Sequence, residues 1–229
     1  MTTFLVTGGA GNIASALVGA LSKDKANYVV VADNLLTGSL HKVPLAKSNV
    51  RFIKCDVNDY NDIAPLFFTF RFDYVFHYAA VVGVQRTLSN PLWVLRDITG
   101  IENVLNLSKN TGVKRIYYSS SSEVYGEPSE YPQHETTTPL NSRLPYAVVK
   151  NVGETYLRTY YREFGLKYVI FRFFNTYGPN QSEDFVVPRF LRQAQQRRYH
   201  RLRRRIANAH VLLCRRQHRS LPECAPQQR

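Results

Sequence analysis

Tyr146 and Lys150 form a pair whose spacing could support acid–base chemistry. They lie four residues apart in a segment with helical periodicity, so both side chains are expected on one helix face. There the cation can stabilise the phenolate and lower the pKa of Tyr146 toward that of a useful base. Among the fifteen tyrosines, only Tyr146 has a lysine four residues later. Such pairs are also common as surface contacts, so the neighbouring sequence must show whether this pair is catalytic.

A polar run from Ser119 to Glu123 follows an expected strand at residues 116–118. Catalytic groups commonly lie where the strands of a parallel sheet end, so this run is placed to meet the Tyr146 pair. The alternative for Glu123 is a solvated loop carboxylate, since loop acids are usually exposed.

The segment from Gly8 to Ala14 has the spacing of a phosphate-binding turn. Gly8 allows a tight turn, Gly11 allows the backbone to approach a pyrophosphate, and the small Ala14 allows a helix to pack closely on a strand. The helix that begins near Asn12 and Ile13 offers free N–H groups and a positive dipole end. Taken alone, the motif is equally compatible with a merely structural turn.

Asp33 makes dinucleotide binding the better interpretation of that turn. It ends the second expected strand, 22 residues after Gly11, where a carboxylate can accept both hydroxyls of an adenosine ribose. An acid at this position disfavours a 2′-phosphate, so we expect NAD and not NADP.

The elements that position these residues alternate between strand-like and helix-like segments, which predicts an α/β fold with a parallel sheet. Near-continuous apolarity of the strands indicates that helices cover both faces, as in a doubly wound Rossmann-type sheet. We expect helices at 12–22, 59–68, 91–110 and 145–164, and strands at 3–7, 28–32, 51–53, 74–77, 116–118 and 168–171.

The composition fits one substantial core, with 229 residues of which 44% are hydrophobic. No apolar run reaches membrane-spanning length and the first residues lack the features of a signal peptide, so we expect a soluble cytoplasmic protein. Cys55, Cys214 and Cys224 lack the spacing of a zinc site or a disulfide framework. The histidines show no ligand spacing either, so no metal is expected.

Together these motifs resemble the extended short-chain dehydrogenase/reductases, specifically the NAD-dependent nucleotide-sugar epimerases, dehydratases and decarboxylases, over residues 3–192. The resemblance implies that Ser121, Tyr146 and Lys150 form the catalytic triad. In that triad Tyr146 removes a proton from the sugar C4 hydroxyl, Ser121 hydrogen-bonds the same oxygen, and Lys150 also holds the nicotinamide ribose.

The resemblance also implies how ligands and subunits are held. It implies a nucleotide-sugar substrate contacted by Ser121, Ser122 and Asn175, and a homodimer built from the helices that flank the triad. The implied contacts to NAD are Gly8, Gly11, Asn12, Ile13, Asp33, Asn34, Asp56, Val57, Ala79, Ala80, Tyr146 and Lys150.

Three reactions can follow C4 oxidation in such enzymes: 4-epimerisation, 4,6-dehydration and decarboxylation. The pair Ser122-Glu123 departs from the Asp-Glu pair of many hexose dehydratases, and Glu123 is expected as a further catalytic residue. UDP-sugar 4-epimerase and UDP-glucuronate decarboxylase stay open, with a GDP-mannose type of dehydratase as the alternative. Asp97 stands where the family commonly has a cofactor-contacting asparagine.

We expect residues 1–175 to form an NAD-binding domain that carries the triad. Residues 176–196 would begin an incomplete C-terminal substrate lobe, and residues 197–229 would be a tail of different origin. Residues 1–192 hold 20 Lys and Arg against 16 Asp and Glu, whereas residues 193–229 hold ten arginines against one acid. Most of the formal net charge of +13 therefore belongs to the tail.

A shifted reading frame would explain this tail. The substrate lobe of the family contains a Val-Tyr-Gly-x-Gly-x-Gln-x-Arg-x-Phe-x-Tyr-Val-x-Asp stretch, which the stated frame lacks. Permitted codons for residues 198–216, read one base later, encode Ala-Ile-Thr-Val-Tyr-Gly-Asp-Gly-Ser-Gln-Thr-Arg-Thr-Phe-Cys-Tyr-Val-Asp-Asp. We therefore expect a frameshift near residues 195–197, a non-native tail, and weak or absent turnover by the chain as written.

The competing hypothesis is a non-catalytic NAD-binding protein whose basic tail binds nucleic acid or another polyanion. Residues 197–205 hold six arginines but a single aromatic residue, Tyr199, for base stacking. This motif is weak, so no nucleic-acid partner is expected; salt-dependent binding that is lost on deleting residues 193–229 would support one.

Overall fold

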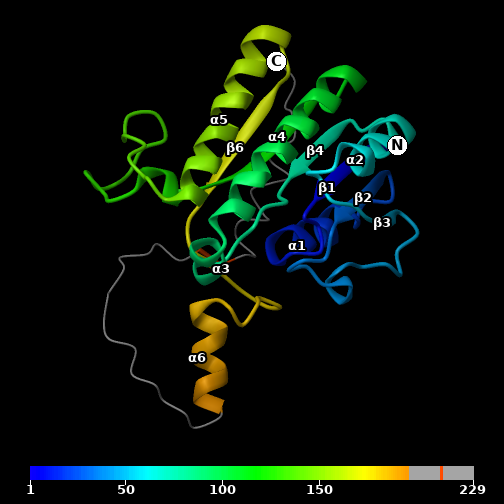
Figure 1. Ribbon diagram of the computed structural model, residues 1–229. Helices are drawn as coiled ribbons and strands as arrows, with labels where there is room; N and C mark the ends of the chain where they lie inside the picture. Colours follow the sequence, from blue (N-terminus) through cyan, green and yellow to red (C-terminus); the bar gives the residue numbers. More distant parts are fainter. Residues whose placement is uncertain (196–211, 214–229) are drawn as a thin grey trace.

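The computed structural model describes residues 1–195 and 212–213, and within them the centre of the fold is a six-stranded parallel sheet (Figure 1). Its strand order is β3-β2-β1-β4-β5-β6. The order reverses between β1 and β4, which is where open parallel sheets bind ligands. The strands are β1 (Thr2–Thr7), β2 (Asn27–Asp33), β3 (Val50–Lys54), β4 (Tyr74–His77), β5 (Arg115–Ser121) and β6 (Tyr168–Phe173).

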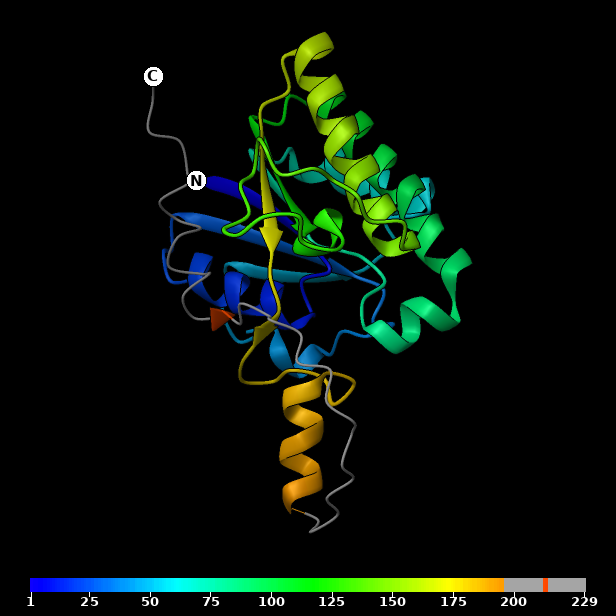
Figure 2. The same cartoon turned by 90° about the vertical axis from the view of Figure 1, so that its left-hand side faces the viewer.

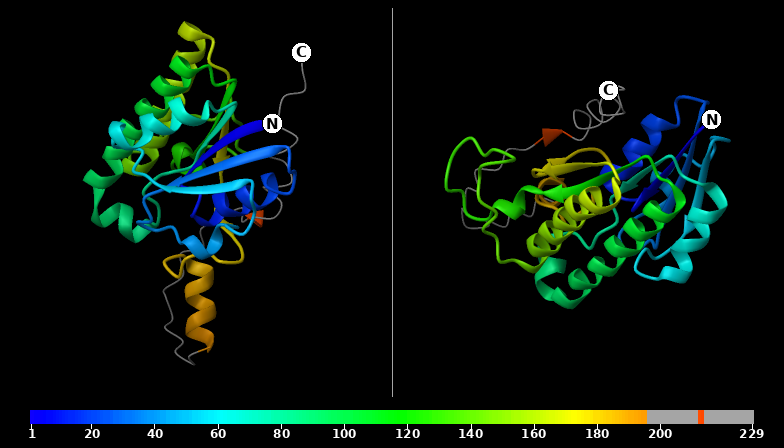
Figure 3. Two further views of the ribbon diagram at one scale, coloured as in Figure 1. Left: turned by 90° about the vertical axis from the view of Figure 1, so that its right-hand side faces the viewer. Right: turned by 90° about the horizontal axis from the view of Figure 1, so that it is seen from above.

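Helices cover both faces of the sheet, so the predicted α/β class and Rossmann-type sheet are confirmed. Three helices, α2 (Tyr60–Phe70), α4 (Pro91–Thr111) and α5 (Pro145–Phe164), share one face, with α4 and α5 side by side (Figure 2). Helix α1 (Asn12–Leu21) lies on the other face (Figure 3). Shorter helices that periodicity did not reveal are η1 (Leu40–Lys42), α3 (Val84–Ser89), η2 (Ser122–Tyr125) and α6 (Val186–Gln195).

Two apolar layers hold the helices on the sheet. Leu5 belongs to the layer beneath α2, α4 and α5, where it is joined by Phe67 and Leu105. Its neighbour Val6 belongs to the opposite layer, with Leu17 of α1. Neighbouring strand residues point to opposite faces, so these apolar runs need cover on both sides.

The chain leaves this body after β6. Two short strands, β7 (Thr176–Tyr177) and β8 (Leu212–Leu213), pair in parallel, and α6 projects away from the main sheet (Figure 1). Apart from β8, the arginine-rich tail and the expected frameshift lie outside the described residues. None of the described helices is long and apolar enough to cross a membrane.

Candidate functional site

The turn between β1 and α1 has no room for side chains at its glycines. Gly8 has a positive φ of 65°, and a Cβ built on it would lie 2.7 Å from the backbone nitrogen of Ala79. A Cβ on Gly11, which caps α1, would lie 3.0 Å from the Gly8 carbonyl oxygen. The turn therefore brings the start of α1 against the loop after β4, with Asn12 and Ile13 opening the helix.

Asp33 is buried at the end of β2 and is tied to this turn. Its Oδ2 accepts a hydrogen bond from the Ala10 N–H at 2.9 Å, and its Oδ1 accepts one from the Leu35 N–H at 2.7 Å. A Cβ on Gly38 would lie 2.8 Å from Oδ1, so glycine at this position allows the chain to pass close to the carboxylate. Each oxygen keeps a further lone pair that could accept from a ligand hydroxyl.

Other predicted cofactor contacts lie around the same edge of the sheet. Asn34 donates to Asp56 through a long hydrogen bond of 3.4 Å, which joins the ends of β2 and β3. Val57 is buried beneath α4, where its carbonyl accepts a hydrogen bond from Asn103. Ala79 and Ala80 are partly exposed in the loop after β4.

Thr7 and His77 connect the ends of β1 and β4, a contact that sequence motifs did not reveal. Their side chains hydrogen-bond at 2.9 Å, and the Thr7 hydroxyl also accepts from the N–H groups of Tyr78 and Ala79. Burial lowers the pKa of His77 to about 3, so its ring is neutral near pH 7. The pair therefore fixes the loop that faces Gly8.

The predicted triad comes together at the end of β5 and the start of α5. Ser121 caps η2 by accepting from the Glu123 N–H at 3.2 Å, and its hydroxyl also hydrogen-bonds the Tyr146 phenol. The Lys150 ammonium is buried, donates to the Ser119 carbonyl at 2.7 Å, and lies 5.7 Å from the Tyr146 ring centroid.

The pKa values of Tyr146 and Lys150 depend strongly on their burial in this cluster. Burial raises the pKa of Tyr146 to about 12; the Ser121 hydrogen bond lowers it, and the charges of Glu123 and Asp97 raise it. Burial is the largest of these causes, so the pKa of Tyr146 is raised in this structure, and the lowering of this pKa by Lys150 stays a prediction. The same burial lowers the pKa of Lys150 to about 8, which Asp97 partly opposes.

Asp97 is a buried acid in α4 whose charge acts on Lys150. Its Oδ2 accepts from the Val81 N–H at 2.7 Å, which ties α4 to the loop after β4. Burial raises the pKa of its carboxyl. Asp97 therefore adds a second ionisable group near Lys150.

Two predicted substrate contacts, Ser122 and Asn175, and the expected catalytic residue Glu123 are more exposed than the buried triad residues Ser121 and Lys150. Ser122 is partly exposed and Glu123 is exposed, both in η2, next to Ser121. Asn175 is exposed in the short link between β6 and β7. In the part of the chain that the structure describes, no group of three or more His, Cys, Asp or Glu residues is placed to hold a metal ion.

Comparison with known proteins connects this arrangement to a defined group. The model of the NAD dependent epimerase/dehydratase family matches residues 4–219. UDP-glucuronic acid decarboxylase 6 of Arabidopsis thaliana is 38% identical over 199 residues, which cover 83% of this chain and 56% of that protein. A putative UDP-glucose 4-epimerase of Methanocaldococcus jannaschii is 34% identical, with coverages of 78% and 57%. The chain thus spans just over half the length of these relatives.

Solved structures show the same fold. UDP-glucose 4-epimerase of Thermotoga maritima, determined with UDP-glucose, superposes with a TM-score of 0.89 at 30% identity and covers 96% of this chain and 72% of that one. UDP-glucose 4-epimerase of Thermus thermophilus, determined with NAD, has a TM-score of 0.74 at 35% identity, with coverages of 80% and 58%.

Proposed function

The chain belongs to the NAD dependent epimerase/dehydratase family, and from this premise we propose that it oxidises a UDP-sugar transiently at C4. The observation that carries the proposal is the hydrogen bond between Ser121 and Tyr146 beside the buried Lys150. This cluster lies at the same sheet edge as the glycine turn. Residues 1–175 would form the cofactor domain and residues 176–196 the start of a substrate lobe.

The residues around the glycine turn fit NAD. A Cβ at Gly8 would clash with the Ala79 backbone and one at Gly11 would press on the Gly8 carbonyl, so these glycines keep the turn tight, and the α1 N-terminus would offer N–H groups to a pyrophosphate. Asp33 is placed to accept ribose hydroxyls. When bound, NAD would supply the acceptor and donor of hydride at the sugar C4.

The chain's own residues would handle the proton. Tyr146 would take it from the C4 hydroxyl, and Ser121 would hold that oxygen by a hydrogen bond. Since Tyr146 has a pKa raised to about 12 here, proton transfer requires added stabilisation of the phenolate. Lys150 is the nearby cation that can provide it once the ligands complete the site.

The proposal includes two reactions of the 4-keto sugar, decarboxylation and 4-epimerisation. The named relatives include a decarboxylase and a 4-epimerase at similar identity, and Glu123 is exposed toward solvent where an acid or base could act. UDP-glucuronate separates the two reactions, since decarboxylation releases carbon dioxide whereas epimerisation keeps every carbon.

The test is a single-turnover experiment with the chain, NAD and UDP-glucuronate at comparable concentrations. Because turnover by this chain is expected to be weak, we expect a slow rise of NADH absorbance at 340 nm within the single turnover. Decarboxylation then gives a product lighter by one carbon dioxide, whereas epimerisation gives a product of unchanged mass that is separated from the substrate by chromatography. Tyr146→Phe should abolish the absorbance change and leave NAD affinity, measured by calorimetry, intact. Equal hydride transfer by Tyr146→Phe would refute the proposed base.

We further propose that the full-length protein forms a homodimer through α4 and α5. These helices lie side by side and expose large apolar residues. Analytical ultracentrifugation tests this, and a monomer at micromolar concentration would contradict it. The exposed residues are Leu92, Trp93, Leu95, Val148, Tyr161 and Phe164.

A further inference from the structure

Glu154 is a fully buried carboxylate that the proposed mechanism does not use. It lies four residues after Lys150 and eight after Tyr146, so it extends the same face of α5 away from the reacting groups. Its Oε1 accepts hydrogen bonds from Ser120 Oγ at 2.6 Å and Arg172 Nε at 2.8 Å. Its Oε2 accepts from Arg172 Nη2 at 2.7 Å and Arg158 Nη2 at 2.8 Å. These four bonds satisfy the whole carboxylate.

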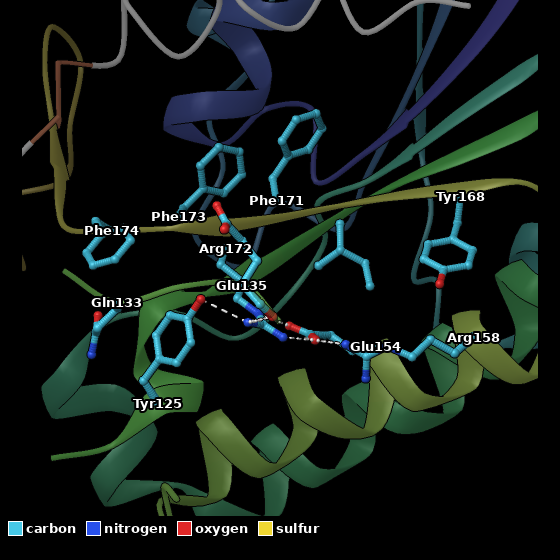
Figure 4. Close-up of a pocket in the computed structure, with 11 residues that line it drawn as sticks. Tyr125, Gln133, Glu135, Glu154, Arg158, Tyr168, Phe171, Arg172, Phe173 and Phe174 are labelled. Atoms are coloured by element: carbon cyan, nitrogen blue, oxygen red, sulfur yellow. Dashed lines mark hydrogen bonds and ion pairs between the residues drawn. The ribbon is translucent and has the colours of Figure 1, made fainter. Parts of the chain in front are cut away.

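Arg172 of β6 connects that carboxylate to the other side of the site. Its side chain is 8% exposed, and its Nη1 donates to the Tyr125 hydroxyl at 2.8 Å and to the Glu135 carbonyl at 2.9 Å. The guanidinium also stacks over the Tyr125 ring, 4.9 Å from its centroid. Figure 4 shows Arg172 between Tyr125 and Glu154, at a pocket of about 440 Å³ beside β6.

The pair joins the two elements that carry the candidate catalytic groups. Tyr125 ends η2, the short helix that begins after Ser121 and contains Glu123, whereas Glu154 lies on α5 with Tyr146. Three consecutive serines at the end of β5 contact three residues of α5 that are spaced four positions apart. The contacts are Ser121 with Tyr146, Ser119 with Lys150, and Ser120 with Glu154.

Stability alone is a poor explanation for this arrangement. Burying an ion pair costs desolvation that well-packed apolar residues avoid, and the best-attested use of such pairs is to fix one geometry. The planar guanidinium can contact the carboxylate, Tyr125 and the Glu135 carbonyl at once, which an ammonium cannot do. Since Arg172 and Ser120 also lower the pKa of Glu154, the pair is charged at neutral pH.

We propose that Glu154 and Arg172 are positioning residues, which hold α5 and η2 in register so that Ser121 stays in contact with Tyr146. The role in catalysis rests on the proposed function. The contact itself can be measured without turnover.

The test uses the whole chain with ¹³C-ζ-labelled tyrosine, in which the Tyr146 resonance is assigned from its absence in Tyr146→Phe. Glu154→Gln and Arg172→Lys should shift or broaden this resonance at pH 7.5, because the Ser121 hydrogen bond is displaced. Arg158→Gln is the matched control. It removes one hydrogen bond to Glu154, but the exposed Arg158 side chain has no described hydrogen bond to Tyr125 or Glu135. This variant should therefore leave the Tyr146 resonance in place.

An unchanged Tyr146 resonance in folded Glu154→Gln and Arg172→Lys would overturn the proposal. If either variant does not fold, Tyr125→Phe decides, since it removes the hydrogen bond from Arg172 to η2 and leaves the ion pair with Glu154 intact; an unmoved Tyr146 resonance then refutes the role. Where the chain turns over UDP-glucuronate, Glu154→Gln and Arg172→Lys should each lower kcat by about 100-fold with little change in KM, which is the effect expected of a misplacement near 1 Å. A moved resonance together with no NADH formation in the single-turnover experiment would retain the positioning role and contradict the proposed oxidation of the sugar by this chain.

Discussion

Replacing Lys150 by methionine should stabilise the folded chain at neutral pH while it removes a candidate catalytic group. Lys150 is 4% exposed, and burial lowers the pKa of its ammonium from 10.5 to about 8. This difference corresponds to a cost of about 3 kcal/mol for keeping Lys150 charged in the folded state. Methionine has a similar length and no charge, so it removes that cost.

The opposing term is the hydrogen bond that Lys150 donates to the Ser119 carbonyl. Leaving this buried carbonyl without its partner costs about 1–3 kcal/mol, and this cost does not depend on pH. The net gain at pH 7 is therefore small, about 0–2 kcal/mol from these two terms. The pH dependence isolates the electrostatic part.

The direction of that pH dependence follows from proton binding. Between pH 8 and 10.5 the unfolded chain holds a proton on Lys150 that the folded chain has released, so wild-type stability rises with pH in this window. The advantage of Lys150→Met should therefore be largest below pH 8 and shrink as the pH approaches 10.5.

Urea unfolding at pH 7.0, 8.5 and 9.5 measures the effect, with unfolding free energies compared at each pH. The exposed Lys23→Met controls for the loss of one positive charge. A difference between wild type and Lys150→Met that stays constant from pH 7.0 to 9.5 would refute the reasoning, because it would mean that the folded chain does not disfavour charged Lys150.

Further expectations concern packing, acid stability and the gene. Gly153→Ala should destabilise by about 1–3 kcal/mol in thermal unfolding, because its Cβ would clash with the buried Tyr118 hydroxyl group. Gly19→Ala, at an open position of α1, should stabilise by about 0.5–1 kcal/mol in the same assay, and equal effects of the two substitutions would contradict this. Wild type should lose stability as pH falls from 6.5 toward 3, since buried His77 must stay neutral, and His77→Gln should show a weaker pH dependence in the same unfolding assay. Sequencing the gene from the codon of Val187 should show a second open frame with the missing motif, and its absence would make the arginine tail authentic.

Local patterns predicted much of the fold and the residues that gather in the candidate site. The glycine turn, the acid at Asp33 and the four-residue spacing of Tyr146 and Lys150 each depend on residues close in sequence, and the helix and strand expectations matched the main elements within a few residues. Glu154 continued the same spacing and could have been found from it.

Other features depended on contacts across the fold and were missed. The Thr7–His77 hydrogen bond joins residues 70 positions apart, which meet because β1 and β4 are neighbours. The partner of Glu154 lies on a strand that pairs with β5, and its identity as Arg172 follows from packing. The raised pKa of Tyr146 likewise results from burial, which no local spacing encodes.

Strand β6 is one of the two edge strands of the six-stranded sheet in the described part of the chain, with β3 at the other edge. A strand in that position presents unpaired N–H and C=O groups to any extended segment that approaches it. Its six residues are only partly buried, and Arg172, whose charge would otherwise repel a second strand, is engaged inward by Glu154. This edge is therefore open to pairing with an extended segment of a second molecule, and we expect added charges along β6 to reduce association between chains more than substitutions in the catalytic cluster do.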